Sequence, residues 1–189
     1  MNDTMRVISE RYSCRAYDGR LPDRDKLEAI AMAAVQAPSA MNLQPWRIIV
    51  VTDKALLDDM DESAMKMLSE AEDKSAYERI KGRGGRMFYN APCMFLIVKQ
   101  KDAASTYVDV DCGILTENIA LAASSMGLGN VICGMAAIPL SGPDGDRYRK
   151  RLGFPDGWGF GVAVLVGHAA DGLATPHEPD KSKITFVSP

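Results

Sequence analysis

Two uninterrupted apolar runs, Cys93–Val98 and Gly159–Gly167, constrain the fold of this 189-residue chain more than any other feature. A strand with one face in water alternates polar and apolar residues, whereas these runs hold no charged side chain, so both faces of each strand must be covered. The repeated valines of the second run favour a strand over a buried helix. We therefore expect two internal strands of a sheet that carries helices on both sides.

The rest of the hydrophobic pattern alternates helices with strands. Helices are expected over residues 4–12, 26–37, 54–68, 108–126 and 147–152, and further strands at 46–52 and within 129–135. Asp3, Asp23 and Asp53 are candidate N-caps of the first three helices, and Pro38 ends the second. This order predicts an α/β (α+β) fold, in which a mixed sheet forms the middle of three layers, and the length fits a single domain over 1–189.

Composition and charge exclude several classes of protein. The net charge is -3, from 22 basic and 25 acidic residues, which argues against a general affinity for nucleic acid or for an anionic membrane. No segment reaches the roughly 18 apolar residues of a membrane span, and the opening residues lack the apolar core of a signal peptide, so a cytoplasmic protein is expected. Four widely spaced cysteines and two histidines predict neither a metal site nor a disulfide framework.

Two short polar motifs near the N-terminus indicate an anionic ligand. The first is Arg11-Tyr12-Ser13-Cys14-Arg15, in which two guanidiniums and a hydroxyl can converge on phosphate oxygens. The second, 38–46, reads Pro-Ser-Ala-Met-Asn-Leu-Gln-Pro-Trp and is a polar loop that leads into a predicted strand. Cys14 is expected to be a small buried hydrophobe; a nucleophile with a thiol pKa lowered by the arginines is the alternative.

A glycine-rich turn, 127–135, follows the predicted helix 108–126 and leads into a short strand. In the dinucleotide fingerprint the glycines follow a strand and open a helix, and here that order is reversed, so a Rossmann site is excluded. Gly134 lies just after the strand, where the missing Cβ would let a ligand approach the backbone closely. An ordinary glycine at a strand end is the alternative.

Taken together, these motifs resemble the FMN-dependent nitroreductase family, whose members carry an R-x-S-x-R/K element and a P-S-x-x-N-x-Q-P-W element that both touch flavin mononucleotide. The resemblance spans nearly the whole chain and implies an intertwined homodimer with two tightly bound FMN sites at the subunit interface. One protomer would supply the residues of the first motif and of the strand exit: Arg11, Tyr12, Ser13, Arg15, Ile132, Cys133, Gly134 and Met135. The other would supply Pro38, Ser39, Ala40, Met41 and Asn42.

The resemblance also assigns roles within the site. An amide N–H near Gly134 would reach flavin N5, Arg11 and Ser13 would hold the phosphate and ribityl chain, and Arg15 would stabilise negative charge on the reduced flavin. In the C-terminal tail, about 170–189, the family usually places an Arg ahead of a Pro, and this sequence departs from that pattern. Lys181 or Lys183 is the favoured cation for the phosphate, with His177 as the weaker candidate.

Residues 70–88 combine charges of both signs with three glycines. They are interpreted either as a solvated cap or as a flexible lid whose cations meet a dinucleotide phosphate or the polar edge of the flavin.

The implied activity is hydride transfer from NAD(P)H through flavin N5 to a small oxidant, such as a nitroaromatic or a quinone, in a ping-pong cycle. The flavin carries the chemistry, so no catalytic acid, base or nucleophile is required of the chain. Two alternatives remain open: a non-catalytic flavin-binding or storage module, and a specialised branch of the same scaffold that performs flavin fragmentation, dehalogenation or azoline oxidation. The sequence distinguishes neither NADH from NADPH nor the physiological electron acceptor.

Overall fold

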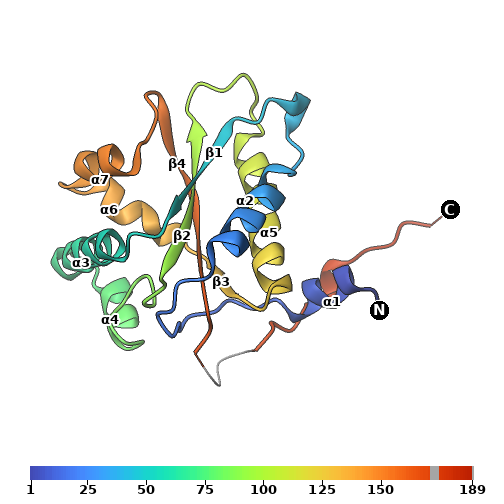
Figure 1. Cartoon of the computed structure of the whole chain (residues 1–189), viewed down its shortest axis with the longest axis horizontal. Helices are drawn as coiled ribbons and strands as arrows, with labels where there is room; N and C mark the ends of the chain where they lie inside the picture. Colours follow the sequence, from blue (N-terminus) through green and yellow to red (C-terminus); the bar gives the residue numbers. More distant parts are fainter. Residues whose placement is uncertain (171–174, 189) are drawn as a thin grey trace.

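The computed structural model describes residues 1–170 and 175–188 and contains a four-stranded sheet (Figure 1). Its strands are β1 (Trp46–Val51), β2 (Cys93–Gln100), β3 (Gly129–Ile132) and β4 (Trp158–Gly167), in the order β1-β2-β4-β3. The two apolar runs are therefore the two central strands, as predicted.

The expectation of a mixed sheet is wrong for these strands, because all three pairings are antiparallel. Alternating helices and strands fix the layers of a fold, but they leave the direction of each strand open. A parallel contact does occur outside the named strands, as the isolated bridge between Ser13 and Asn130.

The side chains of β2 divide the interior into two cores. Met94, Leu96 and Val98 pack into one cluster of buried residues, and Cys93, Phe95 and Ile97 pack into the other. This strict alternation follows from the two-residue repeat of a strand. All six side chains are fully buried, so the apolar run reflects a strand that is covered on both faces.

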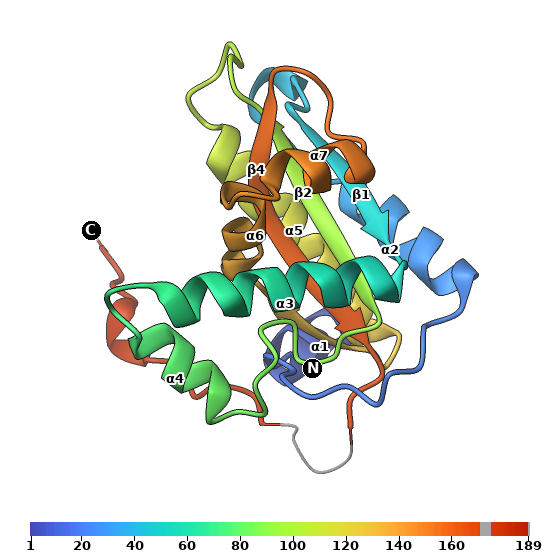
Figure 2. The same ribbon diagram turned by 90° about the vertical axis from the view of Figure 1, so that its left-hand side faces the viewer.

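Helices cover both faces of the sheet, which confirms the three predicted layers (Figures 1 and 2). Helices α2 (Arg24–Val35) and α5 (Val108–Ser125) lie on one face, and their apolar residues belong to the core cluster of Phe95. Helices α3 (Lys54–Glu70), α6 (Ala137–Ser141) and α7 (Gly145–Leu152) cover the other. Helix α4 (Ser75–Lys81) packs beside α3, within the predicted lid.

Helix ends agree with the sequence pattern only in part. Asp53 caps α3 as predicted, since its side chain accepts a hydrogen bond from the amide of Leu56. The cap of α1 (Asp3–Glu10) is Asn2 rather than Asp3, and Asp23 stands at the N-cap of α2 without a side-chain hydrogen bond. Both corrections concern an exposed chain end or loop, where neighbouring polar residues compete for the same amides.

The periphery of the chain is much less covered than its centre. Helix α1 has no buried residue, and every described residue of the tail, 175–188, is exposed. Among its described residues the tail forms one short turn of 3-10 helix, η3 (Lys181–Lys183), and its end projects away from the sheet in both views (Figures 1 and 2). Positions 171–174 and 189 of the predicted tail lie outside the described residues. Over the described ranges, no helix is long and apolar enough to cross a bilayer.

Candidate functional site

The Arg11–Arg15 segment runs alongside β3. Ser13 bridges to Asn130, and the Cys14 amide donates a hydrogen bond of 2.8 Å to the Asn130 carbonyl. The Asn130 side chain is buried and donates to the Ala120 carbonyl in α5, at 3.0 Å. The first motif is thus fixed next to β3, which ends at Ile132, two residues before the 3-10 turn η2 (Gly134–Ala136) begins.

Cys14 anchors this segment as a packed, unreactive residue. Its side chain is fully buried, and burial raises the pKa of its thiol despite hydrogen bonds to Ala16 and two tyrosines. The hydroxyl of Tyr17 lies 3.2 Å from the carbonyl oxygens of both Cys14 and Leu165, which ties the segment to β4. A thiol that stays protonated is a poor nucleophile, so the interpretation of Cys14 as a buried hydrophobe holds.

Polar groups of the first motif face solvent on either side of Cys14. The Arg15 side chain is exposed, and across residues 1–170 and 175–188 it makes no hydrogen bond or ion pair. The Ser13 hydroxyl is half-buried and likewise has no hydrogen bond to any described residue. Arg11 is largely covered, with its Nε 4.0 Å from a carboxylate oxygen of Glu117. An unpaired guanidinium and a free hydroxyl two residues apart are donors suited to phosphate oxygens or to another anion.

The backbone at the exit of β3 is open. No atom lies within 4 Å of the position where a Cβ on Gly134 would stand, and the residue is exposed. Ile132 is also exposed, whereas Met135 is half-buried. Cys133 points into the core, and burial raises the pKa of its thiol to about 11, so only its backbone can face a ligand. A planar ring could therefore approach the backbone at Gly134 without a steric clash.

The second motif lies at the other end of the sheet. Trp46, its last residue, pairs with Lys99 near the end of β2. Gly129, in contrast, pairs with Gly167, which lies beyond the β4 residue that pairs with Cys93 at the start of β2. An eight-residue strand spans about 25 Å, so the structure does not bring the Pro38–Asn42 loop and the Arg11–Arg15 segment of one chain together.

This loop has an unusual backbone conformation. Met41, Asn42 and Gln44 have φ values of 51°, 54° and 48°, the left-handed region that residues with a side chain rarely adopt. The Ser39 hydroxyl accepts a hydrogen bond from the Gln44 amide, at 2.9 Å, and helps to close the turn. Pro38 and Met41 are exposed, and Ser39 and Ala40 are half-buried.

Within the described part of the chain, no hydrogen bond or ion pair joins the tail cations to Arg11 or Arg15. Lys183 lies 3.6 Å from Asp180, whose carboxylate also accepts from the Ser182 amide. Lys181 and His177 are exposed. Which of these three cations reaches an anionic ligand remains a prediction.

Sequence reasoning missed two buried carboxylates, both on helices. Asp61 of α3 accepts hydrogen bonds from the amides of Met87 and Phe88, at 2.9 and 3.0 Å, and so fixes the end of the predicted lid. Asp111 of α5 accepts one from the amide of Ala40, at 3.0 Å. Each is only 2% exposed. Both could have been recognised in the sequence as acidic residues within the apolar stripe of a predicted helix, where burying an unpaired charge would be costly.

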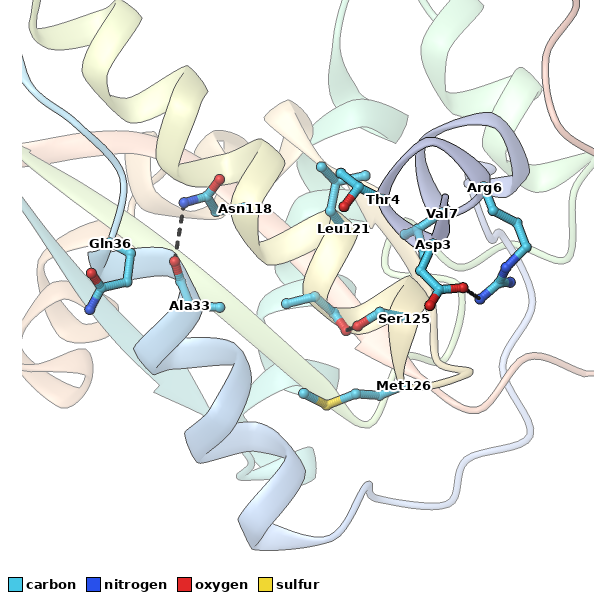
Figure 3. A pocket seen from close by; sticks show the side chains of 11 residues that line it. Asp3, Thr4, Arg6, Val7, Ala33, Gln36, Asn118, Leu121, Ser125 and Met126 are labelled. Carbon is cyan, nitrogen blue, oxygen red and sulfur yellow. Dashed lines mark hydrogen bonds and ion pairs between the residues drawn. The ribbon is translucent and has the colours of Figure 1, made fainter. Parts of the chain in front are cut away.

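A cavity of about 690 Å³ lies between α1, α2 and α5, apart from the predicted site (Figure 3). Val7, Leu121 and Met126 supply part of its apolar lining, and Asn118 donates a hydrogen bond of 3.1 Å to the Ala33 carbonyl at one side. None of the predicted cofactor-binding residues lines it. Cavity size alone therefore does not identify the candidate site.

Comparison with known proteins identifies the family. A family model described as "Nitroreductase family" matches residues 8–168, which include both polar motifs and the exit of β3. The chain belongs to the nitroreductase family. It is therefore a member of an enzyme family that includes NAD(P)H-dependent reductases, and the predicted resemblance is confirmed.

Individual relatives support this assignment. A crystal structure of a nitroreductase with bound FMN from Desulfitobacterium hafniense is 48% identical, with full coverage of both chains and a TM-score of 0.95. A candidate NADH dehydrogenase/NAD(P)H nitroreductase from Archaeoglobus fulgidus is 30% identical over 177 residues, which are 90% of this chain and 88% of that one. An iodotyrosine deiodinase from Thermotoga neapolitana is 24% identical over 177 residues, 87% and 88% of the two chains.

Proposed function

We propose that this protein is an FMN-dependent oxidoreductase that transfers hydride from NAD(P)H to a small oxidant such as a nitroaromatic or a quinone. One observation carries the proposal: unpaired donors at Ser13 and Arg15 lie on a segment fixed along β3, the strand that leads to the open backbone at Gly134. The name of the Desulfitobacterium protein, which includes bound FMN, supports the choice of cofactor.

The residues at this place fit the cofactor. Arg11 and Ser13 would hold the phosphate and ribityl chain, with Lys181 or Lys183 as the further cation, and the backbone at Gly134 and Met135 would face the ring. Bound FMN supplies the chemistry of accepting and passing on a hydride. Arg15 would stabilise negative charge at the ring edge, because an oriented cation in a partly dehydrated site interacts strongly with an anion.

A second copy of the chain would complete the site. One flavin cannot contact both motifs of a single chain if they lie at opposite ends of the sheet, so the Pro38–Asn42 loop would come from a partner. Helix α1 supports this arrangement, because Met5 and Ile8 are 53% and 46% exposed although an eight-residue helix needs packing to be stable. The exposed tail residues Ile184, Phe186 and Val187 are further apolar surface that a homodimer would cover.

An absorption spectrum of the purified protein tests the proposal. We expect a yellow protein, or uptake of added FMN, and bleaching on addition of NADH or NADPH. Colourless protein that takes up no FMN would overturn the proposal. Bound FMN without steady-state NAD(P)H oxidation would instead indicate a flavin-storage module.

The variant Arg15→Ala tests the site itself. Loss of a charge-assisted contact should weaken FMN binding about tenfold. It should also shift the midpoint potential of bound flavin to a more negative value, because the reduced form carries the negative charge. Arg24→Ala is the matched control, since Arg24 is an exposed arginine of α2 paired with Glu28. Equal effects of the two changes would contradict the assignment of Arg15.

Reductive dehalogenation is the second candidate, favoured by the similarity to the Thermotoga deiodinase over most of both chains. The test is halide release from a 3-halotyrosine by the reduced holoenzyme, with a nitroaromatic as the competing oxidant. Halide release that is faster than nitro reduction would assign the chain to that branch.

A further inference from the structure

We propose that Asp111 is a positioning residue that holds the Pro38–Asn42 loop in the shape in which it covers the flavin. This inference rests on the proposed function and adds to it a residue outside both sequence motifs. Asp111 lies in the first turn of α5, more than sixty residues along the chain from the loop that it contacts, and forms a direct hydrogen bond to the Ala40 amide.

The loop needs such an external contact because of its backbone. Three residues with side chains, at 41, 42 and 44, are left-handed, and such conformations persist only when surrounding contacts enforce them. Within the loop, the Ser39 hydroxyl accepts from the Gln44 amide, and the Asn42 side chain accepts from the Gln44 side chain, at 3.0 Å. These bonds close the turn upon itself, but they do not attach it to the rest of the fold.

Asp111 provides the attachment to a rigid element. Its Oδ1 accepts from the Ala40 amide, the first residue of the 3-10 turn η1 (Ala40–Asn42), at 3.0 Å. Helix α5 is packed against the sheet through Leu115 and Ile119, both fully buried. The hydrogen bond therefore fixes Ala40, and with it the left-handed turn, relative to a helix that is packed in the core.

The burial and hydrogen bonding of the Asp111 side chain argue for a positional role. Asp111 is 2% exposed, and its Oδ2 is buried with no hydrogen-bond partner among the described residues. Burying a carboxylate that uses one of its two oxygens costs stability, so stability alone does not account for the residue. A cavity of about 230 Å³ adjoins it and is lined by Pro38, Ser39 and Ala40 on the loop side and by Tyr107, Val110 and Ile114 on the helix side.

Two variants at position 111 separate this role from general packing. Asp111→Ala removes the acceptor, whereas Asp111→Asn keeps an oxygen for the Ala40 amide. Asp109→Ala is the matched control, because Asp109 lies in the same helical turn but is exposed and paired with Lys99. The first readout is hydrogen exchange of the amides at 40–44 in the flavin-free protein, and the second is the Kd for FMN.

We expect Asp111→Ala to accelerate exchange at Ala40 and to weaken FMN binding about tenfold. Asp111→Asn and Asp109→Ala should stay within about twofold of the wild type, well below the effect of an acceptor lost from a hydrogen bond. Unchanged exchange at Ala40 in Asp111→Ala overturns the proposal, and so does an Asp111→Asn variant as weak as Asp111→Ala. A wild-type protein that binds no FMN refutes the proposed function, while hydrogen exchange still decides whether Asp111 holds the loop.

Ala40→Pro approaches the same bond from the donor side. The variant removes the amide N–H, and Ser39, with φ −138° and ψ 156°, already has a conformation that a following proline accepts. In the Ala40→Pro background, Asp111→Ala should have no further effect on the Kd for FMN. An undiminished effect would show that Asp111 acts on something other than Ala40, and would also overturn the proposal.

Discussion

The centre of the sheet and the rim of the molecule differ in how far their apolar side chains are covered. All six residues of Cys93–Val98 are fully buried by helices of their own chain. Helix α1 and the tail, in contrast, bury none of their described side chains, and Phe186 is 89% exposed. One chain is thus sufficient to form the core, whereas its rim carries exposed apolar side chains that the proposed dimer would cover.

The polar groups follow the same division. Buried carboxylates such as Asp61 and Asp111 accept hydrogen bonds from backbone amides, whereas the Arg15 guanidinium at the rim has no partner within the described ranges. The unpaired Arg15 guanidinium is therefore a place where binding of an anion can add stability.

The largest effect on stability is expected from a truncated side chain in the core. Phe95→Ala should lower the free energy of unfolding by about 3–5 kcal/mol, because it leaves a cavity between the sheet and helices α2 and α5. Urea unfolding followed by circular dichroism measures the loss. Phe186→Ala is the control, and at concentrations where the protein is monomeric it should cost less than about 0.5 kcal/mol. Similar losses from both changes would remove the distinction between centre and rim.

A smaller effect is expected at α1. Ile8→Ser should weaken the proposed dimer by about 2 kcal/mol, or about thirtyfold in Kd, because it removes apolar area from an interface. Sedimentation equilibrium measures the change, and Ser9→Ala on the same helix is the control. The stability of the isolated chain should be nearly unaffected, since Ile8 is already 46% exposed. A dimer that is unchanged by Ile8→Ser would place the interface elsewhere.

A pH-dependent effect is expected at Asp61. Burial raises its pKa above the ordinary value of 3.8, although the Phe88 and Met87 amides act in the opposite direction. The contribution of Asp61 to the free energy of unfolding is therefore fully present below pH 3.8, and it is lost as the pH rises through the raised pKa. Relative to Asp61→Asn, the wild type should lose stability as the pH rises above 3.8, as measured by urea unfolding. A relative gain over that range would show that the two amides outweigh burial.

The smallest signal is expected from the cysteines. Burial raises the pKa of the Cys93 thiol to about 12 and of the Cys112 thiol to about 11, and all four cysteines are buried. At pH 8 the native protein should react with a thiol reagent at less than about one-tenth of the rate of the unfolded protein. Rapid labelling of Cys14 in particular would show that the Arg11–Arg15 segment opens away from β3.

Much of the core could be predicted from the sequence, because burial on both faces leaves a direct mark on hydrophobic pattern. The two apolar runs were assigned correctly for that reason, and the Asp53 cap was assigned from the chemistry of an acidic side chain at a helix start. Strand direction could not be, since the pattern of a fully buried strand is the same in parallel and antiparallel sheets. The Asn2 cap was missed because Asp3 beside it offers the same chemistry.

The site was less predictable than the core. The motif residues were found because guanidinium and hydroxyl groups indicate anion binding by their chemistry alone. The left-handed conformation of residues in the turn at 41–44 could not be predicted from the sequence, since none of these residues is glycine. The contact between Asp111 and Ala40 joins residues far apart in sequence and could be seen only once the fold placed α5 beside the loop.

The close packing of the Cys14 side chain on Gly129 has a consequence for how this protein can change. A Cβ at this position would stand 2.7 Å from the sulfur of Cys14 and 2.9 Å from its Cβ, closer than such atoms ever come. Any larger residue at 129 would therefore displace Cys14 and, with it, the Arg11–Arg15 segment. The missing side chain at Gly129 thus sets the distance between the Arg11–Arg15 segment and β3. Positions 14 and 129 can therefore change in size only together.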